Sequence, residues 1–285
     1  MVVAESGQGA KGTESIEIDH WLYGSQPGEG YTTKAVSRGM SVGLYDNYLR
    51  GHYTPIRAAT AQEEGTVNIW MIHPVGSGEE LLLSRMFRGP ADEAGRPTFA
   101  NHTAVVTTEL LRSGRLTLEG VYRALEAFDK KNPRVAGEMA QLSVPIRPAP
   151  EAGTFFGFGV HRSISLPALE TLATRMMTDP RSRTLLLSRD STPESRNRTL
   201  CSAVELLNWA CGLPLFTAIS DSPTSSALKF FKLVVAPRGV RADSSWALLE
   251  SAIGEPALPR VPGRDDVYDV LATAFRQSLS LPSTR

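Results

Sequence analysis

Two short stretches of the sequence alternate apolar and polar residues as β-strands do, and each carries one histidine among its apolar side chains. They span residues 16–24 and 98–106. Successive side chains of a strand point to opposite faces, which places His20 and His102 on apolar faces. The apolar residues that share these faces are Ile16, Ile18 and Leu22 in the first stretch, and Ala100, Ala104 and Val106 in the second. A buried imidazole without a hydrogen-bond partner costs stability. Both histidines are therefore predicted to be buried and structural, and they are the first places to look for a site.

The first half of the chain is rich in strand patterns. Apolar and β-branched runs predict further strands, over residues 31–37, 66–72 and 81–87. Apolar residues at three- and four-residue spacing predict a helix over residues 117–131, and a shorter helix is expected over 41–49. This half should form an antiparallel or mixed sheet with helices attached.

The second half contains more helical patterns. Ser165 and Thr192-Pro193 are typical helix starts, and an apolar stripe predicts a last helix over residues 265–279. Strands are expected over residues 154–160, 183–188 and 228–236. Four prolines between residues 132 and 153 favour a connector there.

These patterns predict an α+β fold with mixed or antiparallel sheets, packed helices and two subdomains. The expected division is a flexible tail at 1–14, a β-rich N-terminal domain at 15–150, and an α+β second domain at 151–285. At 285 residues the chain has room for one large domain or two ordinary ones.

The charge balance weighs against polyanionic partners. Thirty basic and thirty acidic residues cancel, so the chain lacks the basic excess that favours nucleic acid or anionic membranes. No apolar run approaches the ~20 residues of a membrane span. Residues 1–14 lack the apolar core of a signal peptide. We therefore expect a cytoplasmic protein without a membrane partner.

Motifs for bound phosphate or metal are incomplete. The glycine-rich segment 24–34 ends in Lys34, but three residues separate Gly30 from Lys34, which favours a hairpin turn over a phosphate loop. No two of the five histidines have the i, i+4 spacing of a helical zinc site, which favours core histidines. Cys201 and Cys211, ten apart on one expected helix, would lie roughly 15 Å from each other, too far for a disulfide. No cofactor and no metal are expected.

Two functional alternatives stay open from the residues alone. One is an enzyme of unknown class with a site centred on His20 and His102, although no Gly-x-Ser-x-Gly nucleophile motif occurs. The other is a nucleic-acid-binding module that uses a basic stretch, for which a solvated face with Asp190 and Glu194 is the plainer interpretation. The arginines of that stretch are Arg181, Arg183, Arg189, Arg196 and Arg198.

Several short motifs resemble a known family. The segment from His20 to Gly24, then Gly28-Glu29-Gly30, and then residues 35–39 are similar to the opening of the GTPase-associated proteins of bacterial conflict systems. Residues 96–102 resemble the loop of that family that leads into a histidine-bearing strand. Weaker similarities, at 211–214 and 231–235, extend the resemblance over residues 16–240.

The resemblance implies an accessory or adaptor protein of a prokaryotic defence system, acting beside a GTPase and effectors and without catalytic activity. Its partners would be other proteins, including a GTPase or an effector of the same system. Aromatic residues commonly anchor such interfaces, which points to the exposed side of the first hairpin around Trp21, Tyr23 and Tyr31. A place for Trp21 under a helix, in a two-sided core, is the open alternative. The candidate binding residues are His20, Trp21, Tyr23, Tyr31, Arg96, Asn101 and His102.

The expected division of the chain can be tested by limited proteolysis. We expect the first cuts between residues 145 and 153 or in the N-terminal 14 residues, because proline-rich connectors and termini expose their backbone. Mass spectrometry of the fragments identifies the sites. Early cuts within residues 98–106, with the connector protected, would contradict the division.

Overall fold

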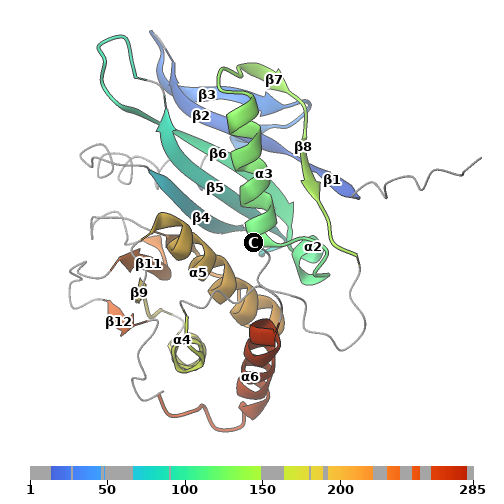
Figure 1. Ribbon diagram of the computed structural model, residues 1–285, viewed down its shortest axis with the longest axis vertical. Helices are drawn as coiled ribbons and strands as arrows, with labels where there is room; N and C mark the ends of the chain where they lie inside the picture. Colours follow the sequence, from blue (N-terminus) through green and yellow to red (C-terminus); the bar gives the residue numbers. More distant parts are fainter. Residues whose placement is uncertain are drawn as a thin grey trace, which may run out of the picture.

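The computed structural model describes residues 14–26, 28–45, 48, 67–89, 91–148, 164–179, 181–188, 192–220, 230–237, 246–250 and 258–280. These residues form five α-helices and twelve β-strands, arranged as a sheet with helices packed against it (Figure 1). The α+β class predicted from the sequence is confirmed. Among the described residues, no helix has both the length and the apolar character needed to cross a bilayer.

The first part of the chain supplies most of the strands. They are β1 (Ser15–Ile18), β2 (His20–Gln26), β3 (Gly30–Ser37), β4 (Asn68–Val75), β5 (Glu80–Gly89), β6 (Thr98–Thr107), β7 (Gly137–Met139) and β8 (Leu142–Pro145). A 3-10 turn, η1 (Val42–Leu44), follows β3, and the helices α2 (Thr108–Arg112) and α3 (Leu118–Lys131) follow β6. Of the helix predicted over 41–49, Val42–Leu44 form this turn and Tyr48 is helical, while residues 46, 47 and 49 lie outside the described residues.

The later part alternates helices and short strands. The helices are α4 (Leu166–Thr178), α5 (Pro193–Glu205) and α6 (Asp265–Ser280), and α5 continues into a π-helical turn, η2 (Leu206–Ala210). The strands are β9 (Thr184–Ser188), β10 (Ala218–Ser220), β11 (Leu233–Pro237) and β12 (Ala247–Glu250). Ser165 and Thr192 cap α4 and α5 through their side chains, as predicted. The strand predicted over 154–160 lies outside the described residues.

Ten strands form one mixed sheet in the order β12-β9-β11-β10-β4-β5-β6-β2-β3-β7. The strands from β4 to β3 pair antiparallel, whereas β10, β11, β9 and β12 pair parallel. The junction is the antiparallel pair of β4 and β10, so both parts of the chain contribute to one sheet. The predicted boundary near residues 145–153 falls at the end of β8 and in a segment outside the described residues.

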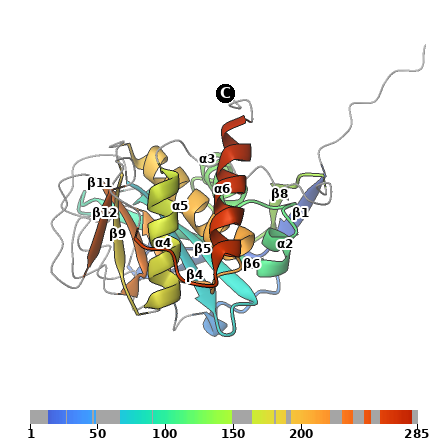
Figure 2. The same cartoon turned by 90° about the horizontal axis from the view of Figure 1, so that it is seen from below.

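Both faces of the central strands are buried. On one face lies a large core that includes residues of α3, α4, α5 and α6, which all cover the same side of the sheet (Figure 2). In β4, Trp70 and Ile72 belong to this core, while Ile69 and Met71 belong to a second core on the opposite face. Two buried faces explain why this strand is a continuous apolar run and not an alternating one.

The first predicted strand is divided at Asp19. Before this residue, β1 pairs with β8, and after it β2 pairs with β3 and β6. At the division itself, the Val105 N–H of β6 donates a hydrogen bond to the carbonyl oxygen of Asp19. The chain therefore changes partners at one residue, and β1 departs from β6 at this point.

A buried carboxyl group holds the start of α3. Glu205, at the end of α5, is 4% exposed, and one of its oxygens accepts the Leu118 N–H at 2.6 Å. Thr117 caps the same helix by accepting the Gly120 N–H. Burial raises the pKa of Glu205 from 4.5 to about 8, because charging the carboxyl there would forfeit its hydration.

We expect Glu205→Gln to change how stability depends on pH. The unfolded chain loses the Glu205 proton near pH 4.5 and the folded chain near pH 8, so the free energy of unfolding should fall as pH rises between these values. Glutamine keeps the acceptor oxygen and does not titrate. Urea unfolding at pH 5 and pH 8 should show similar stability at pH 5 and a more stable variant at pH 8. If the stability difference between wild type and Glu205→Gln were the same at both pH values, the raised pKa of Glu205 would be contradicted.

Candidate functional site

The two histidines meet in the core and form a chain of hydrogen bonds. Nδ1 of His20, on β2, lies 2.7 Å from Nε2 of His102, on β6. Nε2 of His20 lies 2.7 Å from the carbonyl oxygen of Ala140, between β7 and β8. Nδ1 of His102 lies 2.7 Å from Oδ1 of Asp129, on α3. Both imidazoles are 0% exposed, which confirms that they are buried.

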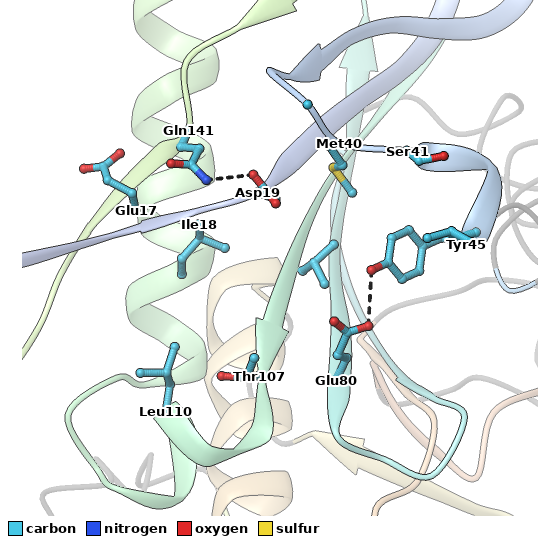
Figure 3. Close-up of a pocket in the computed structure, with 13 residues that line it drawn as sticks. Glu17, Ile18, Asp19, Met40, Ser41, Tyr45, Glu80, Thr107, Leu110 and Gln141 are labelled. Atoms are coloured by element: carbon cyan, nitrogen blue, oxygen red, sulfur yellow. Dashed lines mark hydrogen bonds between the residues drawn. The ribbon is translucent and has the colours of Figure 1, made fainter.

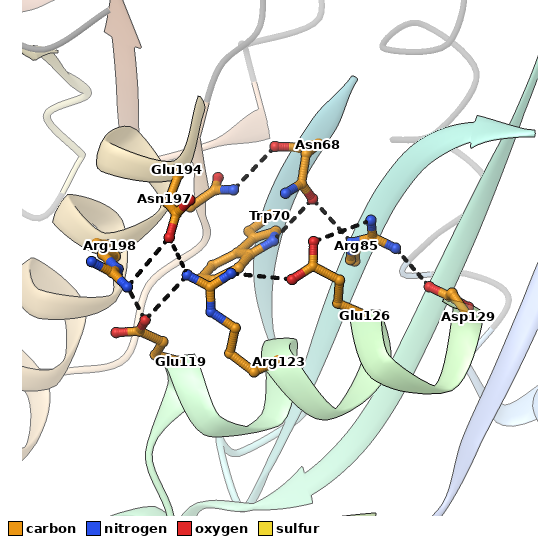
Figure 4. A network of polar contacts seen from close by, with 10 residues as sticks. All are labelled: Asn68, Trp70, Arg85, Glu119, Arg123, Glu126, Asp129, Glu194, Asn197 and Arg198. Carbon is orange, nitrogen blue, oxygen red and sulfur yellow. Dashed lines mark hydrogen bonds and ion pairs between the residues drawn. The ribbon is translucent and has the colours of Figure 1, made fainter. Parts of the chain in front are cut away.

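The chain continues from Asp129 across the sheet to β4. Arg85, on β5, places Nη1 2.6 Å from Oδ2 of Asp129, and its Nε donates to Oδ1 of Asn68. Trp70 donates its indole N–H to the same Asn68 oxygen. Figure 4 shows Asp129 and Arg85 as one end of a larger polar network between α3, α5 and the sheet. Four adjacent strands are thereby linked through one carboxylate.

The chemistry of the partners places the hydrogens along this chain. The Ala140 carbonyl oxygen can only accept, so His20 carries a hydrogen on Nε2. The Asp129 carboxylate likewise accepts from Nδ1 of His102, and one further hydrogen lies between Nδ1 of His20 and Nε2 of His102. A fully bonded chain therefore holds three hydrogens on the four imidazole nitrogens.

The surroundings of His20 favour the neutral form of its own ring. Burial, and then the charge on His102, lower the pKa of His20 from 6.5 to about 4. The Phe128 ring stands edge-on to both imidazoles, with centroids 4.8 Å from His20 and 5.4 Å from His102. These contacts fill the space around the pair with apolar atoms, so no described opening leads to either ring.

All four imidazole nitrogens of the pair are occupied. Consistent with this, the described residues contain no group of three or more His, Cys, Asp or Glu that could hold a metal ion. A pair of an imidazole and a carboxylate can serve as a general base, but only where the imidazole reaches a substrate. Here both imidazoles are 0% exposed, and their nitrogens lie against each other, Ala140 and Asp129.

The other candidate residues are divided between the core and the surface. Trp21 is 2% exposed and stacks on Tyr45, so the expectation that it lies on an exposed hairpin face is wrong. Tyr23 is half-buried and donates to the carbonyl oxygen of Tyr31, whose own hydroxyl accepts the Phe99 N–H. The structure thus uses these aromatic residues to bind β2, β3 and β6 together.

Arg96 and Asn101 lie apart from each other. Arg96 is exposed, and it pairs with Asp92 four residues earlier at 2.7 Å. Asn101 is 3% exposed and lies on β6, opposite Tyr23 and Met86. Among the described residues its Oδ1 has no hydrogen-bond partner. The seven candidates therefore do not share one surface.

The arginines of the alternative nucleic-acid site are scattered as well. Arg196 is 4% exposed, and Arg183 lies over the Trp246 ring. Arg198 pairs with Glu119 and Glu194, as the solvated-face interpretation expected for Glu194 (Figure 4). Arg181 lies in the turn before β9, and Arg189 and Asp190 lie outside the described residues.

Among the described residues, the two cysteines and His73 form no further cluster of chemical groups. Cys201 and Cys211 are free thiols, and burial raises the pKa of both, that of Cys211 to about 12. Thiols in this state are poor nucleophiles. His73 is buried against the Phe231 ring, and His52 and His161 lie outside the described residues.

An open cavity of about 440 Å³ lies where β1 departs from β6 (Figure 3). Its walls come from β1, the segment after β3, the start of β5, the end of β6 and α2. The apolar side chains that line it are Ile18, Met40, Leu44, Val105 and Leu110. Leu44 is 71% exposed at its edge. We call this cavity, with the carboxylates described next, the β1–β6 pocket.

Three carboxylates line the same pocket. Asp19 accepts a hydrogen bond from Gln141 Nε2 at 2.9 Å, and Glu80 accepts one from the Tyr45 hydroxyl at 3.2 Å (Figure 3). Glu17 lies on the same strand as Ile18 and is exposed. No lysine, arginine or histidine is found among the described residues that line the pocket.

Sequence reasoning missed both Asp129 and the β1–β6 pocket. The signal for Asp129 is its position, because it follows Leu125 by four residues on the buried stripe of α3, where a carboxylate needs a partner. Arg85 gives a similar signal within the apolar run of β5. The pocket has no such signal, because its residues come from five separate segments.

Comparison with known protein families finds no family that matches this chain, and comparison with characterised proteins finds no similar sequence.

We expect His20 to make the protein less stable in acid. Below pH 6.5 the unfolded chain protonates this histidine, whereas the folded chain does so only near pH 4. The free energy of unfolding should therefore fall by on the order of 3 kcal/mol as pH drops through this range. Denaturant unfolding of wild type and His20→Gln at several pH values measures the effect. Glutamine can donate to Ala140 and accept from His102 without titrating, so parallel profiles for the two proteins would refute the prediction.

Proposed function

We propose that this chain is a non-catalytic adaptor that binds other proteins, in a cytoplasmic, GTPase-linked defence system of a prokaryote. The resemblance of residues 16–240 to the GTPase-associated proteins of conflict systems supports the system and the kind of partner. The structural support for an adaptor comes from three features: the closed histidine chain, the burial of Arg196 together with the ion pairs of Arg198, and the β1–β6 pocket.

The histidine chain favours an adaptor over the alternative of a histidine-centred enzyme. His20 and His102 are 0% exposed, and all four of their ring nitrogens form hydrogen bonds, with each other, with Ala140 and with Asp129. General acid–base catalysis needs a side chain within hydrogen-bond reach of the substrate. A substrate would reach these rings only after the core had opened.

The described arginines weigh against the nucleic-acid alternative. Phosphate binding requires cationic groups that are free to replace counterions. Arg198 is held by Glu119 and Glu194, and the side chain of Arg196 is buried. The net charge of zero supplies no long-range attraction to a polyanion either.

The observation that carries the proposal is the β1–β6 pocket. It combines an apolar lining with an exposed leucine, Leu44, at its edge. Exposed apolar side chains around a concave surface are typical of places where a partner binds. Of the exposed surface features described above, this one has the chemistry of a protein-binding site.

Capture experiments with Leu44→Asp test the proposal. Wild-type protein immobilised in a lysate of its native host should retain specific proteins, and Leu44→Asp should lose them, because a carboxylate replaces the apolar contact. Mass spectrometry identifies the retained proteins, and re-binding of each purified protein confirms a direct contact. A GTPase or an effector among them would support the proposed system.

Leu248→Asp is the matched control. Leu248 is 51% exposed, and it lies on β12 at the opposite edge of the sheet from β3 and β7. This variant should keep the partners. Equal capture by both variants would contradict binding at the pocket. Nucleotide turnover by the purified chain, or sub-micromolar DNA binding that weakens steeply with salt, would overturn the adaptor in favour of one of its alternatives.

A further inference from the structure

The carboxylates of the β1–β6 pocket carry charge that nothing in the described structure neutralises. Asp19 and Glu80 accept hydrogen bonds only from neutral groups, the Gln141 amide and the Tyr45 hydroxyl. Neither these two carboxylates nor Glu17 forms an ion pair with any described residue. Other carboxylates, such as Glu119 and Asp129, are paired with arginine. The pocket is therefore a concentrated negative site on a protein of zero net charge.

The apolar lining lies directly beside this charge. Ile18 is 4% exposed, and Val105 and Leu110 are half-buried, so these side chains form the deeper wall. Asp19, between β1 and β2, and Glu80, at the start of β5, lie on either side of the opening (Figure 3). A ligand that fits this arrangement has an aliphatic stem and a cationic end. Among protein side chains, lysine and arginine have this form.

The strand pattern around the pocket points to an extended chain as the source of the cation. Beyond Val105, the last two residues of β6, Val106 and Thr107, pair with β5 on one side and have no described partner strand on the other before α2 begins. The opposite edge of the opening is β1, which pairs only with β8. An open strand edge is a place where an extended peptide can add main-chain hydrogen bonds to its side-chain contacts.

We propose that the β1–β6 pocket binds a lysine or arginine side chain presented by an extended segment of a partner protein, with an adjacent apolar residue of that segment on Leu44. This inference rests on the proposed adaptor function and adds the chemistry of the partner. The aliphatic stem packs on Ile18, Val105 and Leu110. The cationic end lies between Asp19 and Glu80, with Glu17 nearby.

The behaviour of Tyr45 agrees with a negative potential in the pocket. Burial raises the pKa of Tyr45, and the charge of Glu80, a hydrogen bond to Glu80 and the charge of Asp19 raise it further. The tyrosine hydroxyl thus stays protonated and donates to Glu80. Its ring, stacked on Trp21, holds this wall of the pocket in place.

A peptide selection tests the proposal on the purified chain. Random twelve-residue peptides displayed on phage are selected for binding to the wild-type protein, and the most enriched sequence is synthesised. We expect enrichment of lysine or arginine next to an apolar residue. Replacing that basic residue by norleucine should weaken binding of the synthetic peptide at least tenfold by titration calorimetry, because the cation is lost while the aliphatic stem remains. Selection without such enrichment would overturn the proposal.

A variant with three amide substitutions tests the role of the carboxylates. In Glu17→Gln/Asp19→Asn/Glu80→Gln each group keeps an acceptor oxygen and loses its charge, so the hydrogen bonds from Gln141 and Tyr45 are preserved. Binding of the synthetic peptide should fall about tenfold or more, which is the size expected when up to three partly exposed ion pairs are lost. The melting temperature of the variant checks that the fold is intact.

The control variant, Glu29→Gln/Glu93→Gln/Asp269→Asn, removes the same charge from exposed carboxylates elsewhere. It should bind the peptide as wild type does, and equal losses in the two variants would overturn a specific site. Binding of 1,5-diaminopentane as tightly as the peptide would also overturn the proposal, in favour of a small-cation site.

The lysate experiment separates failure of this inference from failure of the adaptor function. If the variant with three amide substitutions keeps partners that Leu44→Asp loses, the proposed adaptor function is supported and the proposed binding of a basic side chain is refuted. If the peptide binds through the carboxylates but Leu44→Asp loses no partner, the pocket chemistry stands and the adaptor function at this surface is wrong.

Discussion

The Asp129 carboxylate is the contact on which the arrangement of the first strands depends. One oxygen accepts from His102 on β6, and the other pairs with Arg85 on β5. Through His20 and Arg85 the same chain reaches Ala140 beyond β7 and Asn68 on β4. Removing the carboxylate would leave the buried His102 without its anion and Arg85 with Glu126 as its remaining carboxylate, at 3.7 Å, which is more costly than never having buried them. The contacts of Asp129 with His102 and Arg85 therefore fix the position of α3 on the sheet.

The histidine chain and the β1–β6 pocket differ in how their polar groups are satisfied. Every hydrogen of the imidazole pair has a protein partner, which gives this part of the core a specific arrangement. The β1–β6 pocket has the opposite character, since its carboxylates are only partly satisfied and face solvent. Along the chain, the histidine pair begins just after Asp19, in β2, and the β1 residues that line the pocket come just before it.

Local pattern was enough for much of the fold. The histidine-bearing strands, the α3 and α6 helices and the caps at Ser165 and Thr192 follow from periodicity and capping, which act over a few residues. The expected exposure of Trp21 was wrong because alternation tells which residues share a face but not whether that face is covered. In this sheet the second face is also buried, and Trp21 stacks there on Tyr45.

The sequence by itself determined the α+β class, the balanced charge and the apolar faces on which His20 and His102 lie, because these depend on composition and on short-range geometry. Only the tertiary structure decided their partners. The bonds from His102 to Asp129, from His20 to His102 and from His20 to Ala140 join residues 27, 82 and 120 positions apart. Such contacts depend on the order of the strands. The division at Asp19 has the same origin, because the chain before it pairs with β8 and the chain after it pairs with β6. The pocket lies where these two pairings diverge.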